Sequence, residues 1–135
     1  ANEFGNIIQI ESSGIGELGE SFFNSNIDLG CASIVDEQET GDFIKIKTKP
    51  LLQIVQEHGL QEISGMKIDI EGHEDRALIP FLQHAPKELW PKRIVIEHAH
   101  EKQWKLNLNK VLAESGYSLM RKTRANSLLQ LRSSK

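Results

Sequence analysis

The sequence predicts an α/β domain whose mainly parallel sheet has helices on both faces and ends in an antiparallel hairpin. After residue 42, runs with the two-residue period of strands alternate with segments of helical period, an order that implies right-handed crossovers between parallel strands. One run, Arg93 to Glu97, is continuously apolar in its centre, as expected for a strand of a covered sheet. The last two runs, Tyr117 to Lys122 and Leu128 to Leu131, flank a polar turn and predict the hairpin.

Length and composition favour one domain, residues 1–135, since the chain is 39% hydrophobic and of ordinary domain size. The net charge of -3 gives no electrostatic reason to expect nucleic acid or an anionic membrane as partner. The only cysteine, Cys31, excludes an intrachain disulfide and fits a reducing compartment, so we expect a cytoplasmic protein. The sequence has neither an apolar run long enough to span a membrane nor the pattern of a signal peptide.

The N-terminal third is rich in glycine. Asn6 to Ile10 reads as a strand, and Gly14 to Asp42 reads as a loop-rich region with a possible hairpin. The stretch Gly14 to Gly19 has the spacing G-x-G-x-x-G of dinucleotide-binding loops, a motif that requires a helix directly after it. Glu20 to Asn24 has no helical period, so we interpret these glycines as loop residues.

The rest of the chain alternates between the two periods. Pro80 lies inside a helical pattern and predicts a kink or a restart, while Gly59 and Gly116 are placed to end helices. The predicted elements are strand Phe43–Lys47, helix Pro50–His58, strand Met66–Ile70, helix His73–Gln83, strand Arg93–Glu97 and helix Lys102–Ser115.

Acidic residues gather where two of these strands end. Asp69 and Glu71 share one side of the strand that begins at Met66, because strand side chains alternate, and Glu97 ends the next strand. Open α/β sheets bind their ligands beyond the carboxyl ends of the strands. We therefore expect the functional site there.

The stretch Met66 to Glu74 reads Met-Lys-Ile-Asp-Ile-Glu-Gly-His-Glu and is followed by a helix containing Leu78 and by the strand Ile94 to Glu97. This order resembles the FkbM family of S-adenosylmethionine-dependent methyltransferases, in which a Lys-Ile-Asp-x-Glu-Gly-x-Glu signature closes a strand. The resemblance extends from about Asn6 to the C-terminus. It implies a Rossmann-like class I methyltransferase sheet and O-methyl transfer to a sugar or another small metabolite.

Two departures from the family pattern limit what the resemblance implies. Leu51-Leu52 stands where the family often has Leu-Asp, and no Asp-x-Gly-x-x-x-Gly cofactor loop occurs in the sequence. The chain thus resembles the C-terminal part of a truncated methyltransferase domain whose cofactor-binding half is absent, and we expect the isolated chain to be inactive.

The resemblance also implies roles for individual residues. Asp69, Glu71 and Glu97 would be catalytic, with Asp69 orienting the acceptor or taking its proton. Asp69 and Gly72 would contact S-adenosylmethionine. His73 and His98 would contact the substrate, and no metal is required.

Other interpretations stay open. Asp69 could instead pair with Lys67 or Arg93, and Glu74 and Asp75 could be ordinary acidic residues of a helix start. A metal site is a further alternative, since imidazoles and carboxylates could converge from two strand ends. Its candidate ligands are Glu71, His73, Glu97, His98 and His100.

A third interpretation is a non-catalytic domain that associates with itself. In the family's sheet order, the strand Met66–Ile70 would lie beside the family's first strand. Without that neighbour its edge is unpaired and invites another strand. Unless Ile7 to Ile10 or Phe43 to Lys47 fills the place, we expect a homodimer.

Overall fold

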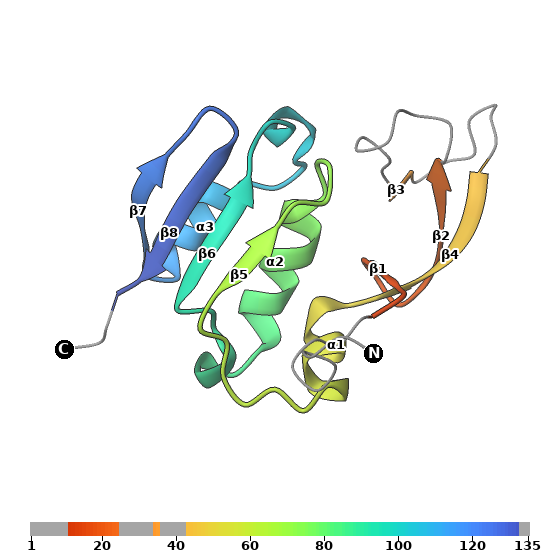
Figure 1. The fold of residues 1–135 in the computed structure, drawn as a ribbon, viewed down its shortest axis with the longest axis horizontal. Helices are drawn as coiled ribbons and strands as arrows, with labels where there is room; N and C mark the ends of the chain where they lie inside the picture. The colour runs from red at the N-terminus through yellow and green to blue at the C-terminus, as the bar shows by residue number, and fades with distance from the viewer. Residues whose placement is uncertain (1–10, 25–33, 36–42, 133–135) are drawn as a thin grey trace, which may run out of the picture.

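The fold is seen in a computed structural model that describes residues 11–24, 34–35 and 43–132. These residues form two four-stranded sheets and three α-helices (Figure 1). The predicted strand Asn6–Ile10 lies outside the described residues. No helix in the described ranges is long and apolar enough to cross a membrane.

The N-terminal sheet contains β1 (Gly14–Ile15), β2 (Gly19–Asn24), β3 (Ile34–Val35) and β4 (Phe43–Lys49) in the order β1-β4-β2-β3. β2 pairs antiparallel with β4 from Gly19↔Thr48 to Asn24↔Phe43. The glycine-rich turn between β1 and β2 thus leads into a strand, so the helix that a dinucleotide loop needs is not there. The hydroxyl of Thr48 fastens this turn by donating to the Glu17 carbonyl at 2.6 Å.

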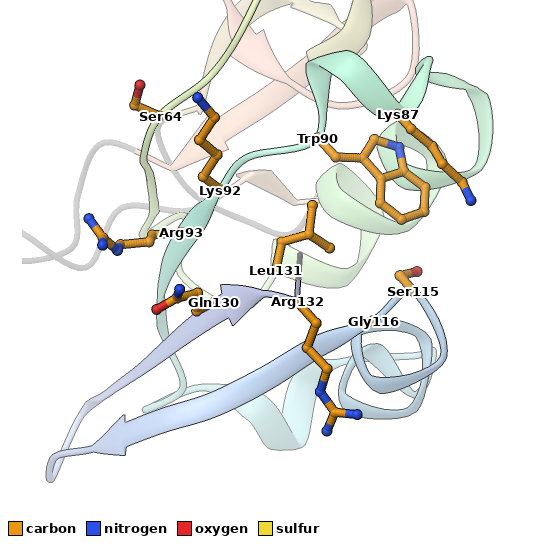
Figure 2. Close-up of a pocket in the computed structure, with 10 residues that line it drawn as sticks. All are labelled: Ser64, Lys87, Trp90, Lys92, Arg93, Ser115, Gly116, Gln130, Leu131 and Arg132. Carbon is orange, nitrogen blue, oxygen red and sulfur yellow. The ribbon is translucent and has the colours of Figure 1, made fainter. Parts of the chain in front are cut away.

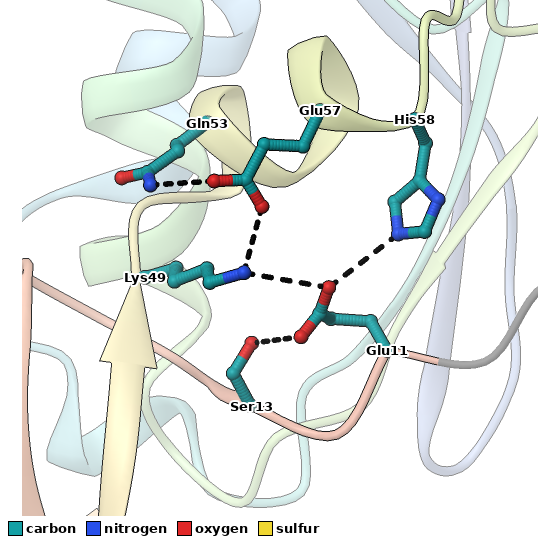
Figure 3. Close-up of polar contacts among 6 residues, drawn as sticks. All are labelled: Glu11, Ser13, Lys49, Gln53, Glu57 and His58. Atoms are coloured by element: carbon teal, nitrogen blue, oxygen red, sulfur yellow. Dashed lines mark hydrogen bonds and ion pairs between the residues drawn. The ribbon is translucent and has the colours of Figure 1, made fainter.

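A polar network joins this sheet to α1 (Leu51–Glu57), the helix predicted after Pro50 (Figure 3). The Lys49 ammonium lies 2.7 Å from the Glu57 carboxylate and 3.6 Å from that of Glu11. The Ser13 hydroxyl donates to Glu11 at 2.7 Å, and the His58 ring lies 3.5 Å from the same carboxylate. The hydrogen bond from Ser13 is the first cause that lowers the Glu11 pKa. The network fixes the end of β4 against α1.

The C-terminal sheet has the order β5-β6-β8-β7. β5 pairs parallel with β6, and β8 lies antiparallel between β6 and β7, so β5, β6 and β7 share one direction. Its elements are β5 (Met66–Ile68), α2 (Glu74–His84), the 3-10 turn η1 (Lys87–Leu89), β6 (Arg93–Glu97), the 3-10 turn η2 (Glu101–Gln103), α3 (Leu108–Glu114), β7 (Tyr117–Lys122) and β8 (Asn126–Leu131). The predicted closing hairpin is confirmed.

The hydrophobic core lies between this sheet and its helices. Ile94 and Ile96 are 0% and 2% exposed, whereas Arg93 on the opposite side of β6 is exposed. In Figure 1, α2 and α3 lie against the same face of the sheet. The Tyr117 hydroxyl closes the core at one end by donating to the Pro91 carbonyl at 2.8 Å.

Two features differ from the predicted fold class. β4 belongs to a separate, largely antiparallel sheet, and the described helices α2 and α3 cover one face of the C-terminal sheet rather than both. The lysines of β4 explain the first difference, because Lys45 and Lys47 are not buried and a strand covered on both faces cannot hold them.

Two predicted helices also differ. α2 runs through Pro80 without interruption, and Pro80 is exposed. The helix predicted for Lys102–Ser115 is only α3, because the backbone N–H groups of Lys105 and Leu106 donate to Asp75 instead of to a preceding helical turn. The Asn107 side chain then accepts from the Lys110 N–H at 3.0 Å and caps the new helix.

Candidate active site at the ends of β5 and β6

A tight turn follows β5. The His73 N–H donates to the Ile70 carbonyl at 3.4 Å, and the residues between them, Glu71 and Gly72, have φ angles of 54° and 93°. Positive φ at both central residues is typical of a type I′ turn, which glycine adopts freely. At Glu71 this backbone costs about 1–2 kcal/mol. The surrounding structure therefore has to hold the Glu71 side chain where it is.

Glu74 provides that support. Its carboxylate is 1% exposed, and one oxygen accepts from the N–H groups of Ile70 at 3.0 Å and Gly72 at 3.2 Å. The other oxygen accepts from the indole N–H of Trp104 at 2.7 Å. The carboxylate thus joins the turn after β5 to the chain beyond η2, a larger role than that of an acidic residue at a helix start.

Asp75 makes a second connection to the same distant segment. It is 0% exposed, and one of its oxygens accepts from the Lys105 N–H at 2.9 Å and the Leu106 N–H at 3.0 Å. Both acidic residues of the first α2 turn are therefore structural. They build the platform on which the neighbouring, more exposed carboxylates are placed.

Asp69, Glu71 and Glu97 come together at the carboxyl ends of β5 and β6. Asp69 forms an ion pair with Lys67, one of the two partners that the sequence offered. Glu71 lies 3.0 Å from the Nε2 atom of His100. Glu97 lies close enough to Asp69 and Glu71 for their negative charges to act on its carboxyl group. The three residues predicted to be catalytic are thus neighbours.

Burial is the main cause that raises the pKa of Glu97, and the negative charges of Asp69 and Glu71 raise it further. The hydrogen bond with Asp69 is likewise the first cause that raises the Lys67 pKa. Asp69 therefore has the Lys67 ammonium as one neighbour and the Glu97 carboxyl group as another.

The other predicted site residues lie elsewhere or are already engaged. The Gly72 N–H donates to Glu74, and a Cβ on Gly72 would meet the Gln103 side chain at 2.5 Å. The His98 ring lies 3.1 Å from the Ser127 hydroxyl, on the side of the C-terminal hairpin. His73 lines a separate cavity. Of the candidate histidines, only His100 lies beside the carboxylates. The spacing His98-x-His100 was the feature of the sequence that indicated it.

The cavity beside His73 measures about 530 Å³ and lies between the β1–β2 turn and the start of α2. Gly16 and Gly19 of the glycine-rich stretch line it, together with Arg76 and Lys105. The glycines are thus loop residues, but they border a space of the size that small ligands occupy.

A second cavity of about 700 Å³ lies at the opposite end of the C-terminal sheet (Figure 2). Its basic residues are Lys87, Lys92, Arg93 and Arg132. Figure 2 shows their charged ends spread around the rim in different directions. Lys92 pairs with Glu62 at 3.0 Å. These side chains do not converge on one point, as an anion site would require.

Comparison with known proteins gives one match. Residues 5–122 match the family model described as the Methyltransferase FkbM domain. No curated protein and no solved structure matches the chain.

Proposed function

The chain belongs to the FkbM methyltransferase family, and we propose that it catalyses S-adenosylmethionine-dependent O-methyl transfer to a sugar or another small metabolite. The main support is the position of Asp69 and Glu97, two carboxyl groups that lie next to each other at the ends of two neighbouring parallel strands. Such a pair suits the reaction because methyl transfer to oxygen requires alignment of a hydroxyl and removal of its proton.

In this proposal the Asp69 carboxylate accepts the proton of the acceptor hydroxyl. The hydroxyl oxygen then forms the new bond to carbon with its lone pair. Glu97 and Lys67 keep Asp69 in position from two sides. S-adenosylmethionine, when bound, supplies the methyl group.

The described residues fit the acceptor side of the reaction better than the cofactor side. The N–H of Gly72 already donates to Glu74, so it is not available for the cofactor contact that the resemblance implied, and in this proposal Asp69 contacts the acceptor instead. We propose that the cofactor lies on strands beside β5. This agrees with the position of β5 at an edge of the described sheet, next to the place of the first strand in a Rossmann-like methyltransferase.

Asp69→Asn provides the test once methyl transfer by the parent chain is detected, and absence of transfer by the parent supports the second candidate below. We expect the transfer of isotope-labelled methyl groups from S-adenosylmethionine to a panel of sugars and small hydroxylated metabolites to fall by about 10²–10⁴-fold, the usual contribution of a general base. Glu101→Gln is the matched control, because Glu101 is exposed and nearby but outside the carboxylate group. An Asp69→Asn variant as active as the parent would contradict the assignment.

The ion pair between Asp69 and Lys67 and the hydrogen bond from the Gly72 N–H to Glu74 also favour a second candidate, a non-catalytic methyltransferase-like domain. Calorimetric titration with S-adenosylhomocysteine separates the two functions. Binding tighter than about 1 mM, or roughly 4 kcal/mol, supports the enzyme. Absence of heat, together with absence of methyl transfer, supports the scaffold.

We further propose a cytoplasmic homodimer, in which the second copy of the chain supplies the strand that lies beside β5. Within the described ranges β5 has a partner strand, β6, on one edge only, and unpaired edges recruit strands. The single cysteine is the reason to expect a reducing compartment. Sedimentation equilibrium over a wide concentration range tests the dimer, and a monomer at the highest concentration would rule it out.

A further inference from the structure

One imidazole and two carboxylates share a small volume at the rim of the candidate active site. One ligand atom each of Glu71, Glu97 and His100 lies within 4.8 Å of the other two. The Glu71 carboxylate comes from the turn after β5, whereas Glu97 ends β6 and His100 follows it, so two adjacent parallel strands supply the set. A nitrogen donor among oxygen donors is a combination that transition-metal sites use.

The charges in this volume are not balanced. Within this volume Glu71 and Glu97 share one basic side chain, the His100 imidazole. Lys67 binds Asp69, and His100 binds Glu71 only as a hydrogen-bond donor or when protonated. A divalent cation between Glu71 and Glu97 would supply the missing positive charge.

The orientation of His100 also suits a ligand. Its Nε2 atom faces Glu71 at 3.0 Å, while the Gln103 amide lies 3.4 Å from Nδ1 on the other side of the ring. Metal-binding histidines are commonly held in this way through their second nitrogen. The side chains of His100 and Glu71 are 39% and 18% exposed, so water or an acceptor hydroxyl can reach the same point.

We propose that Glu71, Glu97 and His100 bind one divalent transition-metal ion of the Mn²⁺ or Zn²⁺ type. Metal–ligand distances of about 2.0–2.2 Å require the three donor atoms to move closer by side-chain rotation. Nε2 gives up its proton to solvent and donates its lone pair to the ion, and the Gln103 amide turns its oxygen toward the Nδ1 proton. Asp69 is not one of the three proposed ligands.

This inference goes beyond the proposed methyl transfer and does not rest on it, because metal binding is measured without cofactor or acceptor. It also narrows the five candidate ligands of the sequence to three. The His98 ring lies 3.1 Å from the Ser127 hydroxyl and His73 lines another cavity, so neither belongs to the proposed ligand set.

The experiment titrates chelator-treated full chain with Mn²⁺ and, separately, with Zn²⁺. Mn²⁺ is followed by electron paramagnetic resonance and Zn²⁺ by calorimetry. We expect one ion per chain, and we expect affinity to fall at least about tenfold in His100→Gln and in Glu71→Gln, as for loss of a ligand group. His98→Gln is the matched control and should bind as the parent does.

A measurement on the unaltered chain protects the test against variants that fail to fold. Bound Mn²⁺ should broaden the ring signals of His100 more than those of His98 in the nuclear magnetic resonance spectrum. The proposal is overturned by absence of stoichiometric binding for both metals. It is also overturned by unchanged affinity in folded His100→Gln, or by stronger broadening at His98.

Discussion

Two groups of carboxylates are close neighbours in the chain but have opposite environments. Glu74 and Asp75 are buried and accept hydrogen bonds from N–H donors on distant segments. Asp69 and Glu97 are more exposed and interact with each other, so their charge is less completely compensated. The same residue type therefore has a structural role at the start of α2 and a proposed catalytic role at the ends of β5 and β6. Mutations should therefore separate stability from activity.

The largest effect is expected for Glu74→Ala. The change leaves two backbone N–H groups and the Trp104 indole N–H without their acceptor. Each buried donor left without an acceptor costs about 1–3 kcal/mol, so we expect the unfolding free energy to fall by about 3–5 kcal/mol. Urea denaturation followed by tryptophan fluorescence measures it. Exposed Glu101→Ala should change the midpoint little, and an equal loss in both variants would mean that burial of Glu74 is not the cause.

Asp75→Ala should cause the second-largest loss of unfolding free energy. It removes one acceptor from the Lys105 and Leu106 N–H groups and releases the chain between η2 and α3. We expect a loss of about 1–3 kcal/mol, the cost of unsatisfied buried donors. Faster amide hydrogen exchange at these two residues, with little change in β6, would identify the mechanism. Unchanged exchange there would contradict it.

The sequence could predict the elements but not these connections. Three elements could be predicted because the periodic pattern of apolar residues lies within each of them, and each was found at nearly the predicted position. They are the strand Met66–Ile70, the helix after it and the strand Arg93–Glu97. The bond from Trp104 to Glu74 spans 30 residues, and no local pattern records it. This long-range bonding is also why half of the helix predicted from Lys102 is absent.

The candidate site shows the same limit. The sequence predicted that Asp69, Glu71 and Glu97 lie near the ends of two neighbouring strands, and the three are neighbours there. Strand alternation does not orient Glu71, because β5 ends at Ile68 and Glu71 lies in the turn after it. It could not choose among the histidines, because the chain leaves strand geometry after Glu97 and the direction of each ring then depends on the turn. His98 turns toward the hairpin and His100 toward Glu71, a distinction that only the folded chain makes.

Gly72→Ala tests how firmly the turn between the two carboxylate groups is held. Gly72 has a φ of 93°, which alanine adopts only under strain, and the new Cβ would displace the Gln103 side chain. We expect a loss of about 1–2 kcal/mol, measured by thermal unfolding. Gly65→Ala is the control, since a Cβ added there would meet no atom within 4 Å and the φ of Gly65 is not positive. Equal shifts in the two variants would contradict the strain.

Glu97→Gln should give the smallest effect, and one of opposite sign. The pKa of Glu97 is raised above its ordinary value of 4.5 by burial and by Asp69 and Glu71, so ionisation of Glu97 is unfavourable in the folded chain. The stability that the protonated carboxyl provides is complete below the ordinary value and is lost as the pH rises through the raised one. A neutral amide at this position should therefore stabilise metal-free protein at pH 7, by about 0.5 kcal/mol for partly exposed charges.

The gain should vanish below about pH 4, where the parent carboxyl is protonated in both states. Thermal unfolding at the two pH values measures it. A gain of the same size at both would show that amide packing, rather than the charge facing Asp69, is responsible.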